Sequence, residues 1–303
     1  METDSDLELS LGIHNAVMPE RAASVADVLS WREGVPERLE LVAHVGREPA
    51  GEGLVAIEPH QRGRSAATLD VCVLPTRRLQ GVGSTLYREL SAWAREHGCS
   101  TLEAWIEEVD ADSLAFAARR GFAEIGRDSR LELDVTQIEA PIVEPPPGIE
   151  ITTWAERPEL ARGMYEVALE AWPDIPGNED DAVGLFEEWL ANELGGAADR
   201  PEATFVALAG EVVVGYAKFH LTDARPTVAI HDITGVKRAW RNRGIARALK
   251  QAEIAWAKQA GYERLQTRNE LRNEPIRRLN EQFGYRELPG MVFLRGPLES
   301  ASA

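Results

Sequence analysis

Two short segments of the chain combine glycine and arginine in a pattern suited to binding phosphate groups. One is WRNRGIARALK at residues 240–250, and the other is RRLQGVGSTL at residues 77–86. In each segment a glycine, Gly244 or Gly81, stands where apolar spacing predicts the start of a helix. Free backbone N–H groups and the helix dipole attract anions there, and glycine lets a phosphate approach the backbone. The alternative is a glycine that only permits close packing of helix on strand.

A candidate proton acceptor precedes the segment at residues 240–250. In the strand pattern TVAIHDITGV, alternation places Asp232 on one face together with Val236, and it places His231 on the opposite face. A carboxylate at this position could take a proton, directly or through water. A structural carboxylate bonded to a neighbouring strand or turn is the alternative.

The elements that position these residues occur twice. The two glycine segments are related by a constant offset (241 − 78 = 163), which also aligns AWAREHG at 92–98 with AWAKQAG at 255–261. A gapless match of glycine, tryptophan and apolar positions over about 50 residues predicts two copies of one fold. We predict an N-terminal domain at 1–137, a C-terminal domain at 149–303, and between them a semi-rigid, proline-rich linker at 138–148.

Each half has the pattern of several strands, a helix, a strand, a second helix and a strand. In the second half, ATFVALAG and EVVVGYAKFH are predicted strands joined by a tight turn at Gly210 and Glu211. The helix predicted at 242–260 ends at Gly261, and MVFLRG at 291–296 is predicted to close this half. The predicted fold class is therefore α/β, an α+β mixed sheet with helices on its faces.

The spacing of the glycine segments differs from that of other phosphate-binding loops. The P-loop pattern GxxxxGK[ST] occurs in neither segment, and GxGxxG fails because Leu86 and Leu249 occupy the third glycine position. The pattern that remains, V-x-x-x-x-R-x-x-G-x-[GA], resembles the pyrophosphate-binding signature of the GNAT superfamily of acyl-CoA-dependent N-acyltransferases. The second half, with TGVKRAWRNRGIARALK and a T-x-N-x-x-x-N stretch, resembles tandem GNAT proteins of bacteria. This resemblance covers nearly all of both halves and implies two tandem GNAT domains that use acetyl-CoA as co-substrate.

The resemblance also implies which residues contact CoA, and it places the oxyanion donor at a backbone N–H near Val236 or Val73. Asn273, at the start of the last helix, would hydrogen-bond the pantetheine arm, although an ordinary helix N-cap explains it equally well. The implied CoA contacts of the first half are Val73, Arg78, Gln80, Gly81, Val82, Gly83 and Ser84. Those of the second half are Val236, Arg241, Arg243, Gly244, Ile245 and Ala246.

Two departures from the family pattern concern the chemistry. An amine is mostly protonated at neutral pH, so its attack on a thioester needs a route for the proton. Family members with a base on this strand have it at the positions of Ile230 or Asp232, so the resemblance makes Asp232 our candidate base, acting directly or through water. The equivalent first-half positions are Ala67 and Leu69, so this half has no evident base. The family's usual acid is a tyrosine four residues before the glycine of G-[FY], and Ala117 and Asn280 stand there instead. A phenolic acid at that position is thereby excluded in both halves, and water or another residue must protonate the leaving thiolate.

An acidic segment in the second half lies where the family has a wall of the acceptor site. Its side chains would suit a cationic amine, although a solvated loop explains them equally well. The candidate acceptor residues are Trp172, Asp174, Glu179, Asp180 and Asp181.

Composition limits the classes of partner. The 303 residues carry a net charge of −17, which argues against nucleic-acid binding, since that needs a cationic surface. No apolar run is long enough to span a bilayer and no signal-peptide pattern is present, so we expect a cytoplasmic protein without a membrane partner. Cys72 and Cys99 are the only cysteines; neither they nor the six histidines show metal-ligand spacing. We predict buried, reduced cysteines and no metal.

The sequence therefore predicts an N-acetyltransferase that moves acetyl from acetyl-CoA to a primary amine of a small molecule by direct attack. The C-terminal domain would be active, and the N-terminal domain would bind CoA without turnover or serve as a structural partner. A monomer or homodimer is expected. The alternatives are a non-catalytic acyl-CoA-binding sensor or scaffold, and a mycothiol-synthase-like acetyltransferase, which the sequence does not single out.

Overall fold

The computed structural model describes residues 4–58, 65–175, 183–270 and 273–300. Three of the predicted acceptor residues, Glu179, Asp180 and Asp181, lie outside these ranges. The chain forms two compact units: unit 1 comprises Met1–Asp128 with Pro289–Ala303, and unit 2 comprises Ser129–Leu288. Within the described residues, no helix has both the length and the apolar character needed to cross a membrane.

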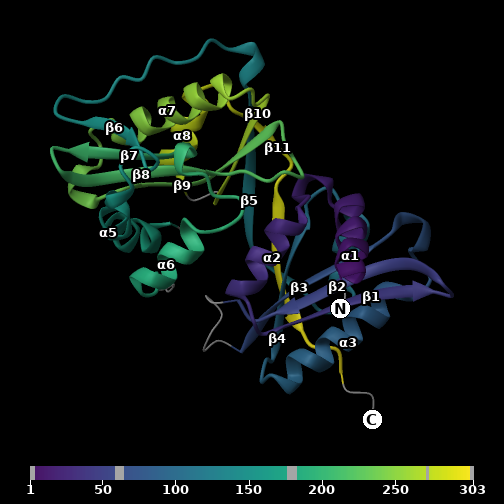
Figure 1. Cartoon of the computed structure of the whole chain (residues 1–303). Helices are drawn as coiled ribbons and strands as arrows, with labels where there is room; N and C mark the ends of the chain where they lie inside the picture. Colours follow the sequence, from purple (N-terminus) through teal and green to yellow (C-terminus); the bar gives the residue numbers. More distant parts are fainter. Residues whose placement is uncertain (1–3, 59–64, 176–182, 271–272, 301–303) are drawn as a thin grey trace. The chain divides into compact units, whose positions relative to one another are not determined.

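Unit 1 is a mixed sheet with helices on both faces (Figure 1). Its elements are α1 (Asp4–Val17), α2 (Val25–Gly34), β1 (Arg38–Val45), β2 (Glu48–Ala56), β3 (Ala66–Val73), α3 (Val82–Glu96), β4 (Thr101–Glu107), α4 (Ala111–Ala118), the first part of β5 (Ala123–Asp134), and β12 (Met291–Pro297). The strand order is β1-β2-β3-β4-β12-β5. Because side chains alternate along a strand, Gly51 of β2 faces α3 while the adjacent Glu52 faces α1. The sheet thus separates two helical layers.

Unit 2 repeats this plan. Its elements are the second part of β5, β6 (Glu150–Thr153), α5 (Ala161–Ala171), α6 (Phe186–Glu193), β7 (Thr204–Ala209), β8 (Val212–His220), β9 (Val228–Val236), α7 (Ile245–Gln259), β10 (Arg264–Glu270), α8 (Glu274–Gln282) and β11 (Arg286–Leu288). The strand order is β5-β10-β9-β8-β7-β6, and β11 pairs with β5. Helices α7 and α8 cover one face, and α5 and α6 cover the other (Figure 1). Buried apolar residues of β8, such as Val214 and Phe219, pack with Ile245 and Leu249 of α7.

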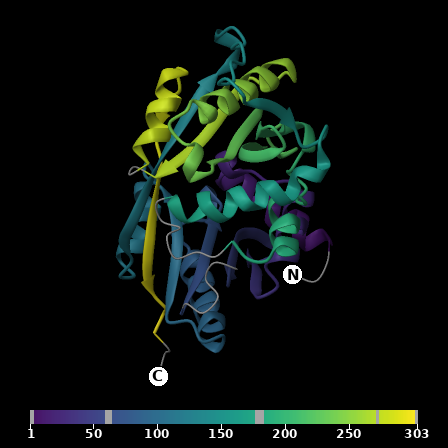
Figure 2. The same cartoon turned by 90° about the vertical axis from the view of Figure 1, so that its left-hand side faces the viewer.

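The closing strand β12 belongs to unit 1, although it follows all of unit 2 in the sequence. It pairs antiparallel with β4 along its whole length, and on its other edge it pairs with the first part of β5 (Figure 2). The Phe122 ring lies directly over Gly296, where an added Cβ would be 2.3 Å from a ring atom. The Tyr87 hydroxyl donates a 2.7 Å hydrogen bond to the Pro297 carbonyl. The strand pattern placed β12 in the second half, whereas the structure completes the other sheet with it.

Strand β5 makes the reciprocal connection. Its first part, through Arg127, pairs with β12 in unit 1. Its second part pairs with β11 in unit 2, where Arg286 lies opposite Glu132. Each half of the sequence therefore contributes a strand to the unit built mainly from the other half.

The proline-rich segment predicted as a linker packs within unit 2. Ile138 and Val143 contact its apolar core, and the Glu144 N–H donates to Gln251 Oε1 of α7 at 3.1 Å. Pro146 Cγ lies 3.6 Å from the position that a Cβ on Gly244 would take. The segment therefore passes beside the second glycine loop.

Candidate active site

The two glycine loops have the same backbone conformation. Gly81 and Gly244 are the N-caps of α3 and α7, with φ of 86° and 87° in the left-handed region that favours glycine. Two residues earlier, Leu79 and Asn242 both have φ of 60°. The left-handed conformation costs free energy for a residue with a side chain. Its occurrence at the same position in both units therefore shows that the two loops share one geometry. Helix α7 begins at Ile245, three residues later than predicted, because residues 242–244 belong to this loop.

The loop of unit 2 presents free donors. Within the described part of the chain, no hydrogen-bond acceptor pairs with the backbone N–H groups of Gly244, Ile245 and Ala246. These N–H groups belong to the first turn of a helix, where no intrahelical acceptor exists and the dipole is positive. Arg241 links the loop to the end of β9, because its Nε donates a hydrogen bond to the Val236 carbonyl at 2.9 Å. An anion would meet several donors here at once.

A cavity of about 680 Å³ joins this loop to strand β9 and helix α8. Neither Trp172 nor Arg243 is among the described residues that line it. The predicted site residues that line it are Asp174, Asp232, Val236, Arg241, Gly244, Ile245, Ala246 and Asn273.

The cavity opens where β9 and β10 separate. Among described residues, their parallel ladder ends at the pair Ile230–Gln266. On the other edge of β9, the register with β8 shifts, so that Asp232 has no direct partner on β8. Such a bulge re-aims side chains, and both His231 and Asp232 line the cavity. Their partners still lie on opposite sides of the sheet, as alternation predicted: Asp232 pairs with Lys218 beside Glu193 of α6, and His231 lies against Glu253 of α7.

The candidate base Asp232 is paired with a buried lysine. Lys218 Nζ lies 2.8 Å from Asp232 Oδ2 and 2.7 Å from Asp199 Oδ1, and it donates to the Glu193 carbonyl at 2.5 Å. The Lys218 side chain is only 3% exposed, whereas that of Asp232 is 43% exposed. Burial acts to raise the pKa of Asp232, but the Lys218 ammonium overcomes it and lowers that pKa below its usual value. Asp232 is therefore ionised at neutral pH.

Lys218 was not identified from the sequence. It stands in the otherwise apolar strand VVVGYAKFH, and a lysine in such a strand needs a buried counter-charge. That exception to the apolar pattern is the signal that would have found it.

A carboxyl group beneath Asp232 titrates close to neutral pH. Burial raises the pKa of Glu193 to about 7, and the Tyr216 hydroxyl donates to Glu193 Oε1 at 3.1 Å. A folded-state pKa above the unfolded value means that stability is lost as the pH rises through about 7. We expect this group to lower the free energy of unfolding by on the order of 2 kcal/mol between about pH 5 and about pH 8.

Glu193→Gln should remove that part of the pH dependence, because the amide keeps the shape of the side chain and cannot ionise. Urea unfolding of both proteins across this pH range measures the difference. Equal slopes for the two proteins would show that Glu193 does not titrate in the folded chain.

A second buried polar group borders the cavity. His231 Nδ1 lies 3.0 Å from Glu253 Oε1, and Lys250 Nζ lies 3.5 Å from Glu253 Oε2. The other ring nitrogen, His231 Nε2, lies 2.6 Å from the Tyr285 hydroxyl. Burial, reinforced by the nearby Lys250, lowers the pKa of His231, so the imidazole is neutral at neutral pH. Lys250 and Glu253 of α7 are both buried, and neither was identified from the sequence.

Asp174 has arginine partners. Arg238 binds it through two hydrogen bonds of 2.8 Å, and Arg241 Nη1 lies 2.7 Å from Asp174 Oδ2. The hydrogen bonds from Arg238 are the main cause that lowers the pKa of Asp174 to about 2. The carboxylate proposed for a cationic acceptor is thus already balanced, and it ties the end of α5 to the glycine loop. Arg243 instead stacks on Trp240, 4.7 Å from the ring centroid.

Residues 13–122 and 161–285 match the model of the acetyltransferase (GNAT) family. The chain belongs to this family. The two matched segments correspond to the two repeats, so the predicted tandem GNAT architecture and mixed α/β fold class are confirmed.

Named relatives of this GNAT chain are acetyltransferases. Mycothiol acetyltransferase of Pseudarthrobacter chlorophenolicus is 24% identical over 268 residues, which are 79% of this chain and 72% of the relative. Mycothiol acetyltransferase of Nocardia farcinica is 27% identical over 259 residues, 79% of each chain. Aminoglycoside N(6')-acetyltransferase type 1 of Stenotrophomonas maltophilia is 27% identical over 153 residues, 48% of this chain and 92% of the relative.

Solved structures share the whole tandem fold. A tandem GNAT protein from the clavulanic acid biosynthesis pathway superposes with a TM-score of 0.77 at 20% identity, covering 99% of this chain and 97% of that one. A GCN5-related N-acetyltransferase from Sphaerobacter thermophilus gives 0.73 at 22% identity, covering 99% and 95%. At these identities the similarity concerns the fold alone.

The two GNAT units differ at the start of their glycine-loop helices. In unit 1, Phe116 lies 3.4 Å from where a Cβ on Gly83 would be. The Arg120 guanidinium stacks on Phe116 and donates to Ser84 Oγ at 2.7 Å. Phe116 and Arg120 therefore pack beside the first turn of α3, while Gly81 and Ser84 remain exposed, and the first turn of α7 borders the cavity.

Two asparagines at α8 stand at positions that the GNAT pattern singles out. Asn273 is the N-cap of α8, yet its side chain makes no capping hydrogen bond and lines the cavity. Asn280, at the position of the family's tyrosine, is fully buried. The amide of Asn273 is thus available to a ligand.

Proposed function

We propose that unit 2 transfers an acetyl group from acetyl-CoA to the primary amine of a small molecule by direct attack. The observation that carries the proposal is a single cavity with two ends. At one end are the unpaired N–H groups of Gly244, Ile245 and Ala246, and at the other is the ionised carboxylate of Asp232. The N–H groups suit a pyrophosphate, and the carboxylate suits an ammonium group.

Each residue would have a distinct task. The first turn of α7 would hold the pyrophosphate, and the Asn273 amide would hydrogen-bond the pantetheine arm. A backbone N–H near Val236 would donate to the oxygen that gains charge as the amine attacks. Lys218 keeps Asp232 ionised and fixes one carboxylate oxygen, which leaves the other for the amine or for a water that removes its proton.

Unit 1 would serve as a structural partner. Its glycine loop has the same backbone as that of unit 2, and Arg120 already donates a hydrogen bond to Ser84 in the first turn of α3. The positions equivalent to the base are Ala67 and Leu69, and neither can accept a proton.

Formation of mycothiol is a more specific candidate for the same site. Two relatives that align with 79% of this chain are named mycothiol acetyltransferase. The amine panel should therefore include the amine whose acetylation would yield mycothiol.

Release of free thiol from acetyl-CoA in the presence of a panel of primary amines tests the function. We expect turnover with at least one cationic small-molecule amine. Tight CoA binding without turnover across the panel would instead support an acyl-CoA sensor or scaffold.

A further inference from the structure

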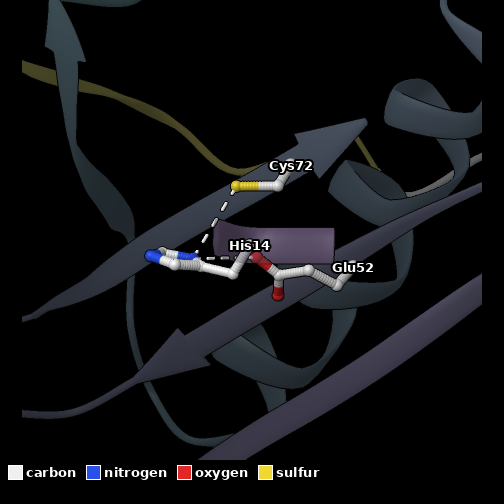
Figure 3. A group of neighbouring side chains, drawn as sticks. All are labelled: His14, Glu52 and Cys72. Atoms are coloured by element: carbon white, nitrogen blue, oxygen red, sulfur yellow. Dashed lines mark hydrogen bonds and ion pairs between the residues drawn. The ribbon is translucent and has the colours of Figure 1, made fainter. Parts of the chain in front are cut away.

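Three side chains with metal-binding atoms meet in unit 1, on the face of the sheet opposite to α3. His14 comes from α1, Glu52 from β2 and Cys72 from β3 (Figure 3). The His14 Nδ1 atom, one carboxylate oxygen of Glu52 and the Cys72 Sγ atom all lie within 4.8 Å of one another. Glu52 and Cys72 are direct partners in the antiparallel ladder of β2 and β3. The His14 side chain, from α1, contacts both of them. Ligands supplied by three elements explain why no spacing motif revealed them.

The separations are close to those of ligands around one zinc ion. His14 Nδ1 lies 3.3 Å from Glu52 Oε1 and 3.9 Å from Cys72 Sγ. Ordinary zinc bond lengths at a tetrahedral angle require about 3.4 Å between nitrogen and oxygen and about 3.6 Å between nitrogen and sulfur. The first distance already fits, and the second needs a contraction of only a few tenths of an ångström.

The orientation of the imidazole also suits a ligand. The second ring nitrogen, His14 Nε2, lies 3.3 Å from the Arg21 carbonyl, which can only accept a hydrogen bond. Assigning the ring proton to Nε2 leaves a lone pair on Nδ1, directed at the carboxylate and the sulfur. A backbone carbonyl that fixes the outer nitrogen in this way is the usual support of a metal-bound histidine.

The charges of the cluster would balance a divalent cation. Glu52 and Cys72 are buried, whereas the His14 side chain is 21% exposed and borders solvent. One carboxylate and one thiolate neutralise Zn²⁺, so the buried complex carries no net charge. Asp70, whose Oδ1 lies 3.7 Å from Cys72 Sγ, is paired through its other oxygen with Arg21 at 3.6 Å. The separation of Asp70 Oδ1 from Cys72 Sγ also suits two ligands of one tetrahedral zinc ion.

The same place in unit 2 shows that the fold does not require these residues. Tyr216 pairs with Gly235 there, as Glu52 pairs with Cys72 in unit 1. Val167 and Ala171 of α5 pack onto Gly235. Aromatic and aliphatic side chains therefore pack the helix against the sheet in unit 2, at the place where unit 1 has the polar cluster.

We propose that His14, Glu52 and Cys72 form a zinc-binding site in unit 1. The Cys72 thiol releases its proton to solvent as the sulfur–zinc bond forms, and water or Asp70 fills the fourth position. Zinc would join α1 to β2 and β3 and so stabilise unit 1. The sequence-based prediction of no metal considered only the spacing of ligands along the chain. Spacing could not reveal a site whose ligands come from three separate elements.

Titration of the metal-free full-length chain with Zn²⁺, followed by calorimetry, tests the site. We expect one equivalent to bind per chain and to raise the Tm. With Co²⁺ as the probe, a thiolate-to-metal charge-transfer absorption should appear. Glu52→Gln and Cys72→Ala should each weaken zinc binding by about 100-fold or more, and Cys72→Ala should also abolish the charge-transfer absorption.

Cys99→Ala is the matched control, because Cys99 is the other buried cysteine of unit 1 and lies outside the cluster. It should keep both the stoichiometry and the absorption. Wild-type protein that binds no stoichiometric zinc, or whose Co²⁺ complex lacks the thiolate absorption, would overturn the proposal. So would zinc affinity that survives Glu52→Gln unchanged, a readout that stands even if Cys72→Ala does not fold.

Discussion

Gly244→Val is expected to abolish measurable binding of CoA to unit 2. A side chain at this position would stand between the pyrophosphate and the N–H groups of the first turn of α7. Within the described residues, these N–H groups have no hydrogen-bond acceptor. Loss of two hydrogen bonds to a charged group, at about 1.5–3 kcal/mol each, lowers affinity about 100-fold or more. Calorimetric titration with CoA measures the change.

The same helix provides a control for backbone strain. Gly261, at the other end of α7, has φ of 88°, almost equal to the 87° of Gly244, and an added Cβ would meet no atom within 4 Å. Gly261→Val should therefore carry a similar conformational cost, about 1–2 kcal/mol, and leave CoA affinity unchanged. If both variants bind CoA like the wild type, the glycine loop is not the pyrophosphate site.

Gly81→Val separates the two units. Since the proposed CoA site is the cavity of unit 2, this variant should keep wild-type CoA affinity. A large loss of affinity in Gly81→Val would assign CoA binding to unit 1 and contradict the proposed active unit.

Asp232→Asn is expected to lower turnover about 100-fold or more while CoA affinity stays intact, the usual scale for loss of a general base. The amide keeps the size of the carboxylate and can still accept from Lys218, so the fold is retained. What disappears is the negative charge facing the cavity, which would attract the ammonium group and take its proton. Steady-state rates and CoA titration, measured on the same preparation, separate the two effects.

Asp199→Asn is the matched comparison. Asp199 binds the same Lys218 nitrogen at 2.7 Å, but its side chain is only 7% exposed and does not line the cavity among the described residues. This variant should lose stability and keep most of its turnover. Equal losses of rate in both variants would mean that Asp232 acts only by holding Lys218 in place, and an unchanged rate in Asp232→Asn would remove it from the mechanism.

The sequence predicted those parts of the molecule that depend on local pattern. The two αL glycines, the helices that follow them and the turn at Gly210 all follow from local residue types and spacing. The site was less predictable because its geometry depends on contacts across the fold. The bulge at Asp232 is a matter of register with β8, and Lys218 acquires its role only through Asp199 and Asp232.

Strand neighbours were the other feature that local pattern could not supply. The residues of β12 identify a strand, but a strand pattern does not say which edge the strand will join. Pro289 and Gly290 end β11 and let the chain leave unit 2 before β12 begins. The same limit applies to His14, Glu52 and Cys72, which come together through the packing of α1 on its sheet.

The place of β12 has a consequence for the order in which the protein matures on the ribosome. Residues 101–107 of β4 emerge early, but their partners at 291–297 are synthesised after all of unit 2. Until then β4 presents an open edge, which is the kind of surface that recruits foreign strands. The first half to be translated is therefore the last to be completed, and a chain that stopped before residue 291 would leave unit 1 without β12 while unit 2 was already whole.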